Sequence, residues 1–340
     1  MTELLAGQKQ QQRPRLADID QCKGLAIFLV VVGHVKLSAT WSGYGALDWL
    51  TSTIYQFHMS FFMFLSGLVT WYTYRPVRCW GDYTRYVGYR FRRFFPAYVL
   101  FALLISLSKS GLSPYVYVDN VPQNLLVDWA RFTVNPLNSS ATSLWYIYVL
   151  LAYTVIMPPL LWLARNNLAW LLPAALVVHF IPVTNLFSLS RVAEHAFVFV
   201  AGGLVAHRYA AFAGHVDRWW WVYVPLFLIS CAAWEFLTIN PVLIKFITGL
   251  ISVPALVGLV RRYWLQSRLL AILSKCTFAI YLVNMLAIGA IKAAASKFGL
   301  WDQPGGIILA PIMVCGGLFI PVLAKKYLFN KVHWLDKITT

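Results

Sequence analysis

Lys23 and His34 are the residues of this chain whose types and spacing point most directly to chemistry. They bracket an apolar run, Gly24 to Val35, that has no ionisable group besides His34. Eleven helical steps return to about the starting direction and rise about 16 Å, so both side chains share one helix face. If the run crosses a membrane, His34 lies near mid-depth, where an ionisable group costs about 2.5 kcal/mol or more. Such a group normally faces a polar cavity and has a function. The alternative is a histidine satisfied by a neighbouring helix.

A second histidine is expected at a similar depth. His58 lies in the apolar segment 50–72, about 12 Å below the outer surface if this segment runs back through the membrane. Two histidines at one depth can form an acid/base centre, because imidazole takes up and releases a proton near neutral pH. A structural His58 bonded to a backbone carbonyl is the equal alternative. Two histidines without HxxxH or HExxH spacing do not indicate a metal site.

The segment 72–95 carries six arginines and one aspartate. Membrane topology and contact with lipid headgroups can account for most of this charge. The end of the segment is more specific, because Arg90 and Arg93 lie one helical turn apart, with Arg92 between them. A guanidinium group offers forked donors to a phosphate, so these arginines are candidates for holding a phosphorylated ligand.

The composition defines the class of protein in which these residues act. Hydrophobic residues make up 60% of the 340 residues, charged residues make up 12%, and the mean hydropathy is +0.65. These values exclude an ordinary soluble domain and predict an all-α polytopic integral membrane protein. Runs that can cross about 30 Å of hydrocarbon, or nearly so, predict ten helices at 24–40, 50–72, 91–108, 143–163, 168–187, 192–210, 219–238, 242–260, 269–295 and 305–327.

The distribution of the +16 net charge favours a membrane topology over binding to nucleic acid. With the N-terminus in the cytoplasm, about three quarters of the 28 lysines and arginines fall on the inner side, which is the bias of the positive-inside rule. Both termini are therefore expected in the cytoplasm, with tails at 1–22 and 329–340 and a membrane domain at 23–328. No cleavage site follows the N-terminal tail, so no removed signal peptide is expected. The five dispersed cysteines indicate neither disulfides nor a metal cluster.

Polar and aromatic residues on the expected outer side form a candidate substrate pocket. Glu194 and Glu235 can hydrogen-bond the hydroxyl groups of a sugar, and Trp145 and Tyr146 can line such a pocket. The alternative is a belt of aromatic and polar residues at the membrane interface.

A resemblance to one known family extends over most of the chain. The segment DIDQCKGLAIFLVVVGH resembles the start of the family-three membrane acyltransferases, in which a basic residue, ten intervening residues and a histidine mark the first helix. Lys23 and His34 occupy those positions, and Asp18 and Asp20 match the acidic residues before them. Further matching stretches are FHMSFFMFLSG at 57–67, RFRRFFPAY around Arg90 and Arg93, SLWYIYVLL at 143–151 and FAIYLVNML at 278–286.

The resemblance implies transfer of an acyl group, most often acetyl from cytoplasmic acetyl-CoA, to a hydroxyl of a saccharide or surface glycan. His34 is then the general base, with Lys23, Asp20 and His58 as further catalytic candidates. A thioester is already activated, so a positioned base and an oxyanion donor suffice. No permanently bound cofactor is expected.

The CoA donor would bind on the inner side, where the arginines named above suit its phosphates. Its pantetheine arm would reach His34 through a water-filled channel along the helix face of Gly24, Ile27 and Val31. The expected partners are thus acyl-CoA, the acceptor and the lipid bilayer of a cell membrane, which is the inner membrane in a bacterium.

The chain departs from the family pattern at two positions. Lys23 replaces the usual arginine, so ion pairing with Asp20 is its expected role. Asn284 stands where many members carry a histidine, which leaves His34 as the better candidate base and makes Asn284 a candidate substrate contact. The chain is expected to be a stand-alone form without a fused esterase-like domain.

Other functions remain open from the sequence alone. A transporter or a flippase for a lipid-linked saccharide could also use ten helices and polar residues at mid-depth, although no inverted repeat is visible. The other large class of membrane-bound acyltransferases needs a late histidine in a long apolar helix, which His179, His195 and His333 do not match. A purely structural function leaves the cost of burying His34 and His58 unexplained. The oligomeric state is left open.

Overall fold

The structure is a computed structural model that describes residues 14–35, 45–115, 118–236, 240–300 and 306–339. These residues form helices and no β-strand, so the predicted all-α fold is confirmed for the described part of the chain. The α-helices are α1 (Ala17–His34), α2 (Gly45–Tyr72), α3 (Trp80–Leu112), α4 (Leu125–Val134), α5 (Trp145–Leu163), α6 (Leu171–Phe180), α7 (Leu189–His207), α8 (Tyr209–Phe236), α9 (Pro241–Leu259), α10 (Arg268–Lys275), α11 (Thr277–Lys297), α12 (Gly306–Tyr327) and α13 (His333–Thr339).

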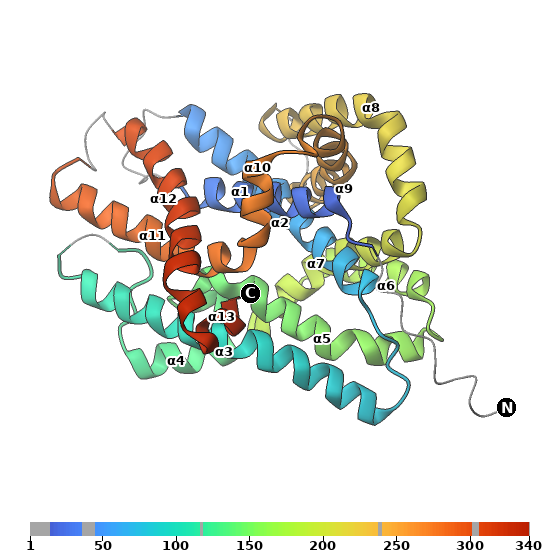
Figure 1. Ribbon diagram of the computed structural model, residues 1–340, viewed down its shortest axis with the longest axis horizontal. Helices are drawn as coiled ribbons and strands as arrows, with labels where there is room; N and C mark the ends of the chain where they lie inside the picture. Colours follow the sequence, from blue (N-terminus) through green and yellow to red (C-terminus); the bar gives the residue numbers. More distant parts are fainter. Residues whose placement is uncertain (1–13, 36–44, 116–117, 237–239, 301–305, 340) are drawn as a thin grey trace.

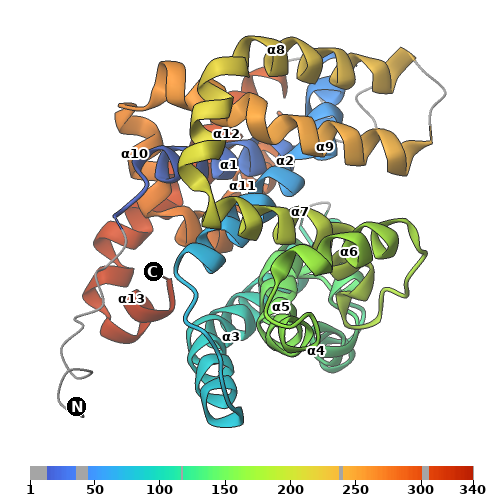
Figure 2. The same ribbon diagram turned by 90° about the vertical axis from the view of Figure 1, so that its right-hand side faces the viewer.

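α1 lies in the middle of the bundle, where it packs against α2, α10 and α11 (Figure 1). Most of its residues between Cys22 and Val31 are buried. In Figure 2, α3, α4, α5 and α6 lie in the lower half of the view, and α8 and α9 lie in the upper half. α2 and α7 run between these two groups, so side chains on α1, α2 and α7 point into the interior.

α2 and α7 approach each other closely at two glycines. A Cβ atom added to Gly67 would lie 2.0 Å from the carbonyl oxygen of Phe199, and one added to Gly202 would lie 2.1 Å from that of Phe64. Only a residue without a side chain allows two helix backbones to come this close, as small residues do between membrane helices. The two helices are therefore held together by backbone contact.

The substitution Gly67→Ala is expected to destabilise the protein, because the new methyl group would force α2 away from α7. Overpacking of this kind costs about 1–3 kcal/mol, so the melting temperature of the detergent-purified protein should fall. Gly289→Ala in α11 is the matched control, because nothing lies within 4 Å of a Cβ at that helical position. A Gly67→Ala protein that melts together with Gly289→Ala would contradict the close approach.

Six helical segments among the described residues are long and apolar enough to cross a membrane, which makes the chain a multi-pass membrane protein. They are Trp80–Leu112, Thr142–Leu163, Leu186–His207, Pro241–Trp264, Thr277–Lys297 and Ile308–Lys331. The predicted count of ten spans and the cytoplasmic position of both termini remain predictions.

The first predicted span differs from the helix that forms. The predicted segment was 24–40, whereas α1 begins seven residues earlier and carries Asp18, Asp20 and Lys23 in its first two turns. Among the described residues α1 ends at His34, and the remainder of the predicted span, 36–40, lies outside them.

Two later predicted spans are shorter or divided. The segment 168–187 contains the ten-residue α6 between two 3₁₀ turns, Leu168–Trp170 and Leu186–Ser188. α6 is about 15 Å long and too short to cross about 30 Å of hydrocarbon. The segment 269–295 is divided at Cys276 into α10 and α11. At this break the Thr277 hydroxyl donates to the carbonyls of Leu273 and Ser274, and such bonds compete with the helical backbone pattern.

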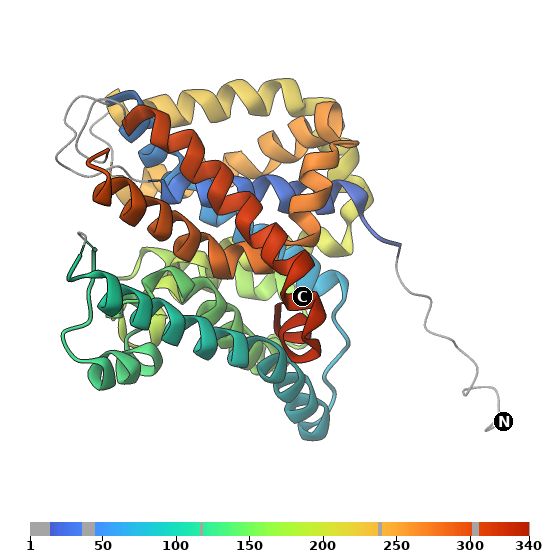
Figure 3. The ribbon, with the colours of Figure 1, turned by 60° about the vertical axis from the view of Figure 1, so that its left-hand side comes forward.

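The predicted C-terminal tail is folded onto the bundle. α13 packs against α3 (Figure 3). The Lys325 ammonium of α12 donates to the Asp336 carboxylate at 2.7 Å and to the Thr339 hydroxyl at 3.0 Å. These bonds fix the last helix against α12.

Candidate active site

His34 and Asn284 form a hydrogen-bonded pair between the end of α1 and the first half of α11. The Nδ1 atom of His34 lies 2.8 Å from Oδ1 of Asn284. Asn284 is fully buried and His34 is half-buried. The two residues are 250 positions apart in the chain, and the pair links a helix near each end of the sequence.

The bonds of Asn284 determine which nitrogen of His34 carries the proton. The Asn284 Nδ2 group donates to the carbonyls of Ile280 and Tyr281, both at 2.8 Å. This fixes the amide orientation, so that Oδ1, which only accepts, faces His34. In its neutral form His34 must therefore donate from Nδ1 and carry its lone pair on Nε2, the arrangement of a histidine base.

His58 lies near His34, on α2. It is close enough to interact electrostatically with His34, and also with His195 and Lys245. Its Nδ1 donates to the Ile54 carbonyl at 2.7 Å, which is the structural bond considered as the alternative from the sequence. Because this bond uses Nδ1, the neutral ring of His58 also carries its lone pair on Nε2.

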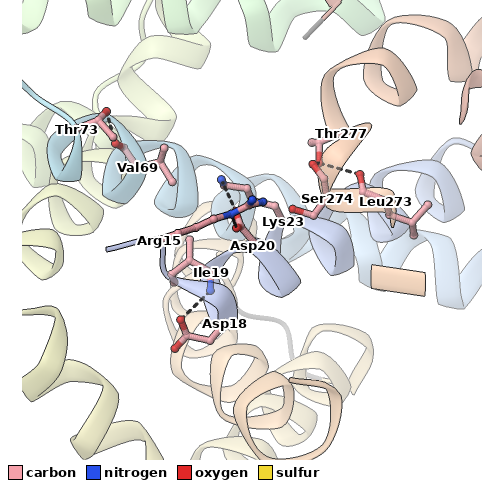
Figure 4. A network of polar contacts seen from close by, with 10 residues as sticks. All are labelled: Arg15, Asp18, Ile19, Asp20, Lys23, Val69, Thr73, Leu273, Ser274 and Thr277. Atoms are coloured by element: carbon pink, nitrogen blue, oxygen red, sulfur yellow. Dashed lines mark hydrogen bonds and ion pairs between the residues drawn. The ribbon is translucent and has the colours of Figure 1, made fainter. Parts of the chain in front are cut away.

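Lys23 and Asp20 lie at the other end of α1, far from the His34–Asn284 pair. The Lys23 ammonium donates to Asp20 at 3.1 Å, and Arg15 forms a second ion pair with the same carboxylate (Figure 4). The predicted ion pairing of Lys23 with Asp20 is thus present. Eleven helical residues separate Lys23 from His34, so these groups do not meet around one reacting atom.

The expected channel along α1 is closed, and that prediction was wrong. A Cβ atom added to Gly24 would lie 2.2 Å from the carbonyl oxygen of Leu270, because α10 packs directly onto this face. Ile27 and Val31 are fully buried on the same face. The sequence could not show this, because α10 was predicted as part of one continuous membrane helix.

Asp18 anchors the start of α1 in a way that the sequence did not indicate. Its carboxylate pairs with Arg261 in the π-helical turn after α9 and accepts a hydrogen bond from the Tyr209 hydroxyl. Arg261 also donates twice to Asp217 of α8, each time at 2.7 Å. The two carboxylates and the arginine join α1, α8 and the end of α9.

Stability is expected to decrease in acid partly through Asp217. The hydrogen bonds from Arg261 lower the pKa of the Asp217 carboxyl below its ordinary value of 3.8. Its contribution is therefore present above pH 3.8 and is lost as the pH falls through the lower, folded-state pKa. The melting temperature of Asp217→Asn should consequently vary less with pH in this range than that of the wild type. Identical pH dependence of the two proteins would contradict this assignment.

A pocket between α2, α3, α5 and α7 contains the half-buried Arg90. Its enclosed space is small, about 30 Å³. Its walls are largely aromatic and aliphatic, with polar contributions from Thr70, Tyr86 and Thr154. The Arg90 guanidinium lies 5.7 Å from the centre of the Tyr86 ring. The pocket thus combines one cation with a long apolar wall.

The other two candidate arginines lie outside this lining. Arg93 follows Arg90 by one turn, and its guanidinium lies 5.2 Å from the centre of the Phe94 ring. Arg92 is exposed. Of the three predicted phosphate-binding arginines, the structure brings only Arg90 into the pocket.

Tyr146 lies between the pocket and the His34–Asn284 pair. Its hydroxyl is 2.6 Å from Ser66, which is one turn from the pocket residue Thr70. Its ring meets the ring of Tyr281 edge-on at 5.2 Å, and Tyr281 is three residues before Asn284. Tyr146 therefore packs between the α2 wall of the pocket and the turn of α11 that precedes Asn284. Tyr146 itself is buried in the core.

Glu194 and Trp145 belong to a separate polar cluster at the start of α7. Glu194 pairs with Arg191 and with Lys245 of α9, both at 2.5 Å. Trp145 stacks on the ring of His195 at 5.2 Å. From the sequence, Glu194 was expected to share a substrate pocket with Glu235. Glu235 lies on α8, and its side chain is outside the described part of the structure.

The fold and site define a multi-pass helical membrane protein with a half-buried histidine bonded to a buried asparagine, and with a separate pocket that contains an arginine. Residues 16–326 match the acyltransferase domain family, the acyltransferase 3 family, and the chain belongs to it. The chain is thus a membrane acyltransferase, as the sequence motifs indicated. No curated protein and no solved structure matched the chain.

Proposed function

We propose that this protein transfers an acyl group, acetyl in the first instance, from acyl-CoA to a hydroxyl of a saccharide or surface glycan. The observation that supports this most directly is the 2.8 Å bond between His34 Nδ1 and Asn284 Oδ1. It orients a histidine so that Nε2 can accept a proton, which is what the deprotonation of an acceptor hydroxyl requires.

In the proposed reaction His34 acts as base and then as acid. Its Nε2 takes the proton of the acceptor hydroxyl while the hydroxyl oxygen attacks the thioester carbonyl carbon. The tetrahedral intermediate collapses, the C–S bond breaks, and the leaving CoA sulfur receives the proton from His34 Nε2. Asn284 keeps the ring in place and stabilises the transient imidazolium through its Oδ1.

The pocket that contains Arg90 is the proposed donor site. Arg90 supplies a charge-assisted hydrogen bond to a phosphate of CoA, and the apolar wall contacts the pantetheine arm once its side chains have moved apart. Ser66 and Tyr146 are packed between this pocket and the turn of α11 that carries Asn284, so they must move aside for the thioester to reach His34. Arg92 and Arg93 lie on the same helix and can meet the remaining phosphates outside the pocket.

The other catalytic candidates receive supporting roles in this proposal. Lys23 and Asp20 fix the start of α1 through their ion pair, and His58 forms part of the polar wall next to the base. The candidates for contact with the acceptor remain those on the expected outer side, Glu194, Glu235, Trp145 and Tyr146. The protein would act in a cell membrane, with the donor reaching it from the cytoplasm.

The direct test is acyl transfer by the purified protein in detergent or nanodiscs. Acetyl-CoA labelled in the acetyl group is incubated with saccharide acceptors, and the products are analysed by mass spectrometry for the label and for free CoA. Labelled ester together with one equivalent of CoA is expected. Movement of a lipid-linked saccharide across proteoliposomes without any ester formation would instead support the transporter or flippase.

A further inference from the structure

The polar cluster at the start of α7 contains two buried nitrogen atoms that make no hydrogen bond within the described residues. They are Nδ1 of His195 and Nε of Arg191. The His195 side chain is only 2% exposed, and its Nε2 lies 3.9 Å from the Glu194 carboxylate, too far for a hydrogen bond. Buried polar atoms without a partner are uncommon in folded proteins and call for a specific explanation.

Arg191 and His195 lie on one face of α7. Arg191 and His195 are four residues apart, which places them one above the other on a helix. Both contact the same ring, because Trp145 stacks on His195 at 5.2 Å and the Arg191 guanidinium lies 5.4 Å from its centre. The unpartnered nitrogens therefore share one aromatic neighbour.

The cluster extends from a partly exposed edge to a buried end. The side chains of Arg191 and Lys245 are 38% and 36% exposed, whereas that of Glu194, which holds both, is 22% exposed. His195 forms the buried inner end, and both His195 and His34 interact electrostatically with His58. A polar ligand that enters at the edge thus meets Arg191 and Lys245 first and His195 last.

The donor pocket adjoins this cluster. Phe199, which lines the pocket, follows His195 by one turn of α7, a rise of about 6 Å. Donor and acceptor would therefore approach the same interior region from different openings. Such an arrangement suits a direct transfer between two substrates bound at once.

We infer that the cluster of Arg191, Glu194, His195, Lys245 and Trp145 binds a neutral, polyhydroxylated acceptor, with Arg191 Nε and His195 Nδ1 bonding to its hydroxyl groups. A hydroxyl fits both atoms, because it accepts from the guanidinium N–H and can donate to or accept from the imidazole. The Glu194 carboxylate already balances one of the two positive charges, those of Arg191 and Lys245. The cluster therefore does not favour a strongly anionic ligand. This inference rests on the proposed function for the reaction, but its binding step can be measured alone.

The test uses His195→Phe, which keeps an aromatic ring against Trp145 but removes Nδ1. The probes are the methyl glycosides of glucose, galactose and rhamnose, and the two readouts are the thermal shift that each causes and the KM for its acetylation. We expect the substitution to raise the glycoside KM about tenfold or more, as loss of a buried hydrogen-bonding partner does, and to remove the thermal shift. The KM for acetyl-CoA should not change.

Two further variants make the result interpretable. Arg191→Lys keeps the charge toward Glu194 but removes Nε, and it should weaken glycoside binding even if His195→Phe fails to fold. His207→Phe is the matched control on the same helix, because its Nδ1 already bonds to the Gly203 carbonyl. It should behave as the wild type does.

The outcomes separate this inference from the proposed function. An unchanged glycoside KM and thermal shift in both cluster variants would overturn the inference, as would a wild-type protein that neither binds nor acetylates any of the glycosides. If glycosides bind to the wild type but not to His195→Phe and no ester is formed, the binding site stands and the acyltransfer proposal fails.

Discussion

The substitution His34→Ala is expected to lower acyl transfer about 10²- to 10⁴-fold, the usual contribution of a positioned general acid–base group. Without an imidazole beside the acceptor, the hydroxyl must attack while it still carries its proton. The loss should appear in kcat with little change in the KM for acetyl-CoA, because the donor pocket does not contain His34. Initial rates of labelled ester formation, measured at saturating donor, provide the check.

Controls distinguish a lost base from a damaged fold. His215→Ala removes an exposed histidine of α8 and should retain wild-type activity. Asn284→Ala leaves His34 in place but removes the bond that orients its ring. The expected loss of activity is smaller, about 10- to 100-fold, as for other groups that orient a histidine. Normal turnover by His34→Ala protein with a wild-type melting temperature would remove His34 from the mechanism.

The substitution Arg90→Ala is the second change with a large expected effect. Losing a charge-assisted hydrogen bond to phosphate costs about 1.5–3 kcal/mol, which raises the KM for acetyl-CoA about 10- to 100-fold. Arg90→Lys should recover only part of the affinity, because an ammonium keeps the charge but lacks the planar fork. Donor KM and direct binding of CoA by calorimetry both measure this effect.

Arg85→Ala is the matched control for the donor site, since Arg85 is an exposed arginine of the same helix and does not line the pocket. Arg93→Ala tests the second arginine of the pair separately. If the double variant at Arg90 and Arg93 binds CoA as tightly as the wild type, the arginines of α3 serve topology and lipid contact, and the donor must bind elsewhere.

The sequence was sufficient to predict the class of fold and the family, and it provided candidates for the functional groups. High hydropathy with few charges required a helical membrane protein, and a histidine in an apolar run identified His34 without any structural knowledge. Arg90 was distinguished from the other arginines of its segment by its spacing from Arg93. Each of these inferences uses composition or spacing within one segment.

Features that depend on contacts between distant segments could not be predicted in this way. Asn284 was recognised only as a departure from a family pattern, and its bond to His34 depends on how α1 packs against α11. The same limit explains the wrong prediction about Gly24, since hydropathy does not distinguish a face that lines a channel from one that contacts another helix. His195 gave no signal either, because a histidine at the start of an apolar helix is common at a membrane interface.

The close approach of α2 and α7 has a mechanical consequence. Thr70 and Phe199 line the donor pocket, and His195 forms the inner end of the acceptor cluster, yet all three belong to this one helix pair. Two backbones in contact at Gly67 and Gly202 cannot slide or separate without breaking that contact. With the two substrates bound as proposed, α2 and α7 act as a fixed frame that keeps the distance between them constant. Any movement that admits or releases a substrate must come from the helices on either side, α3 and α5 around the donor and α9 around the acceptor.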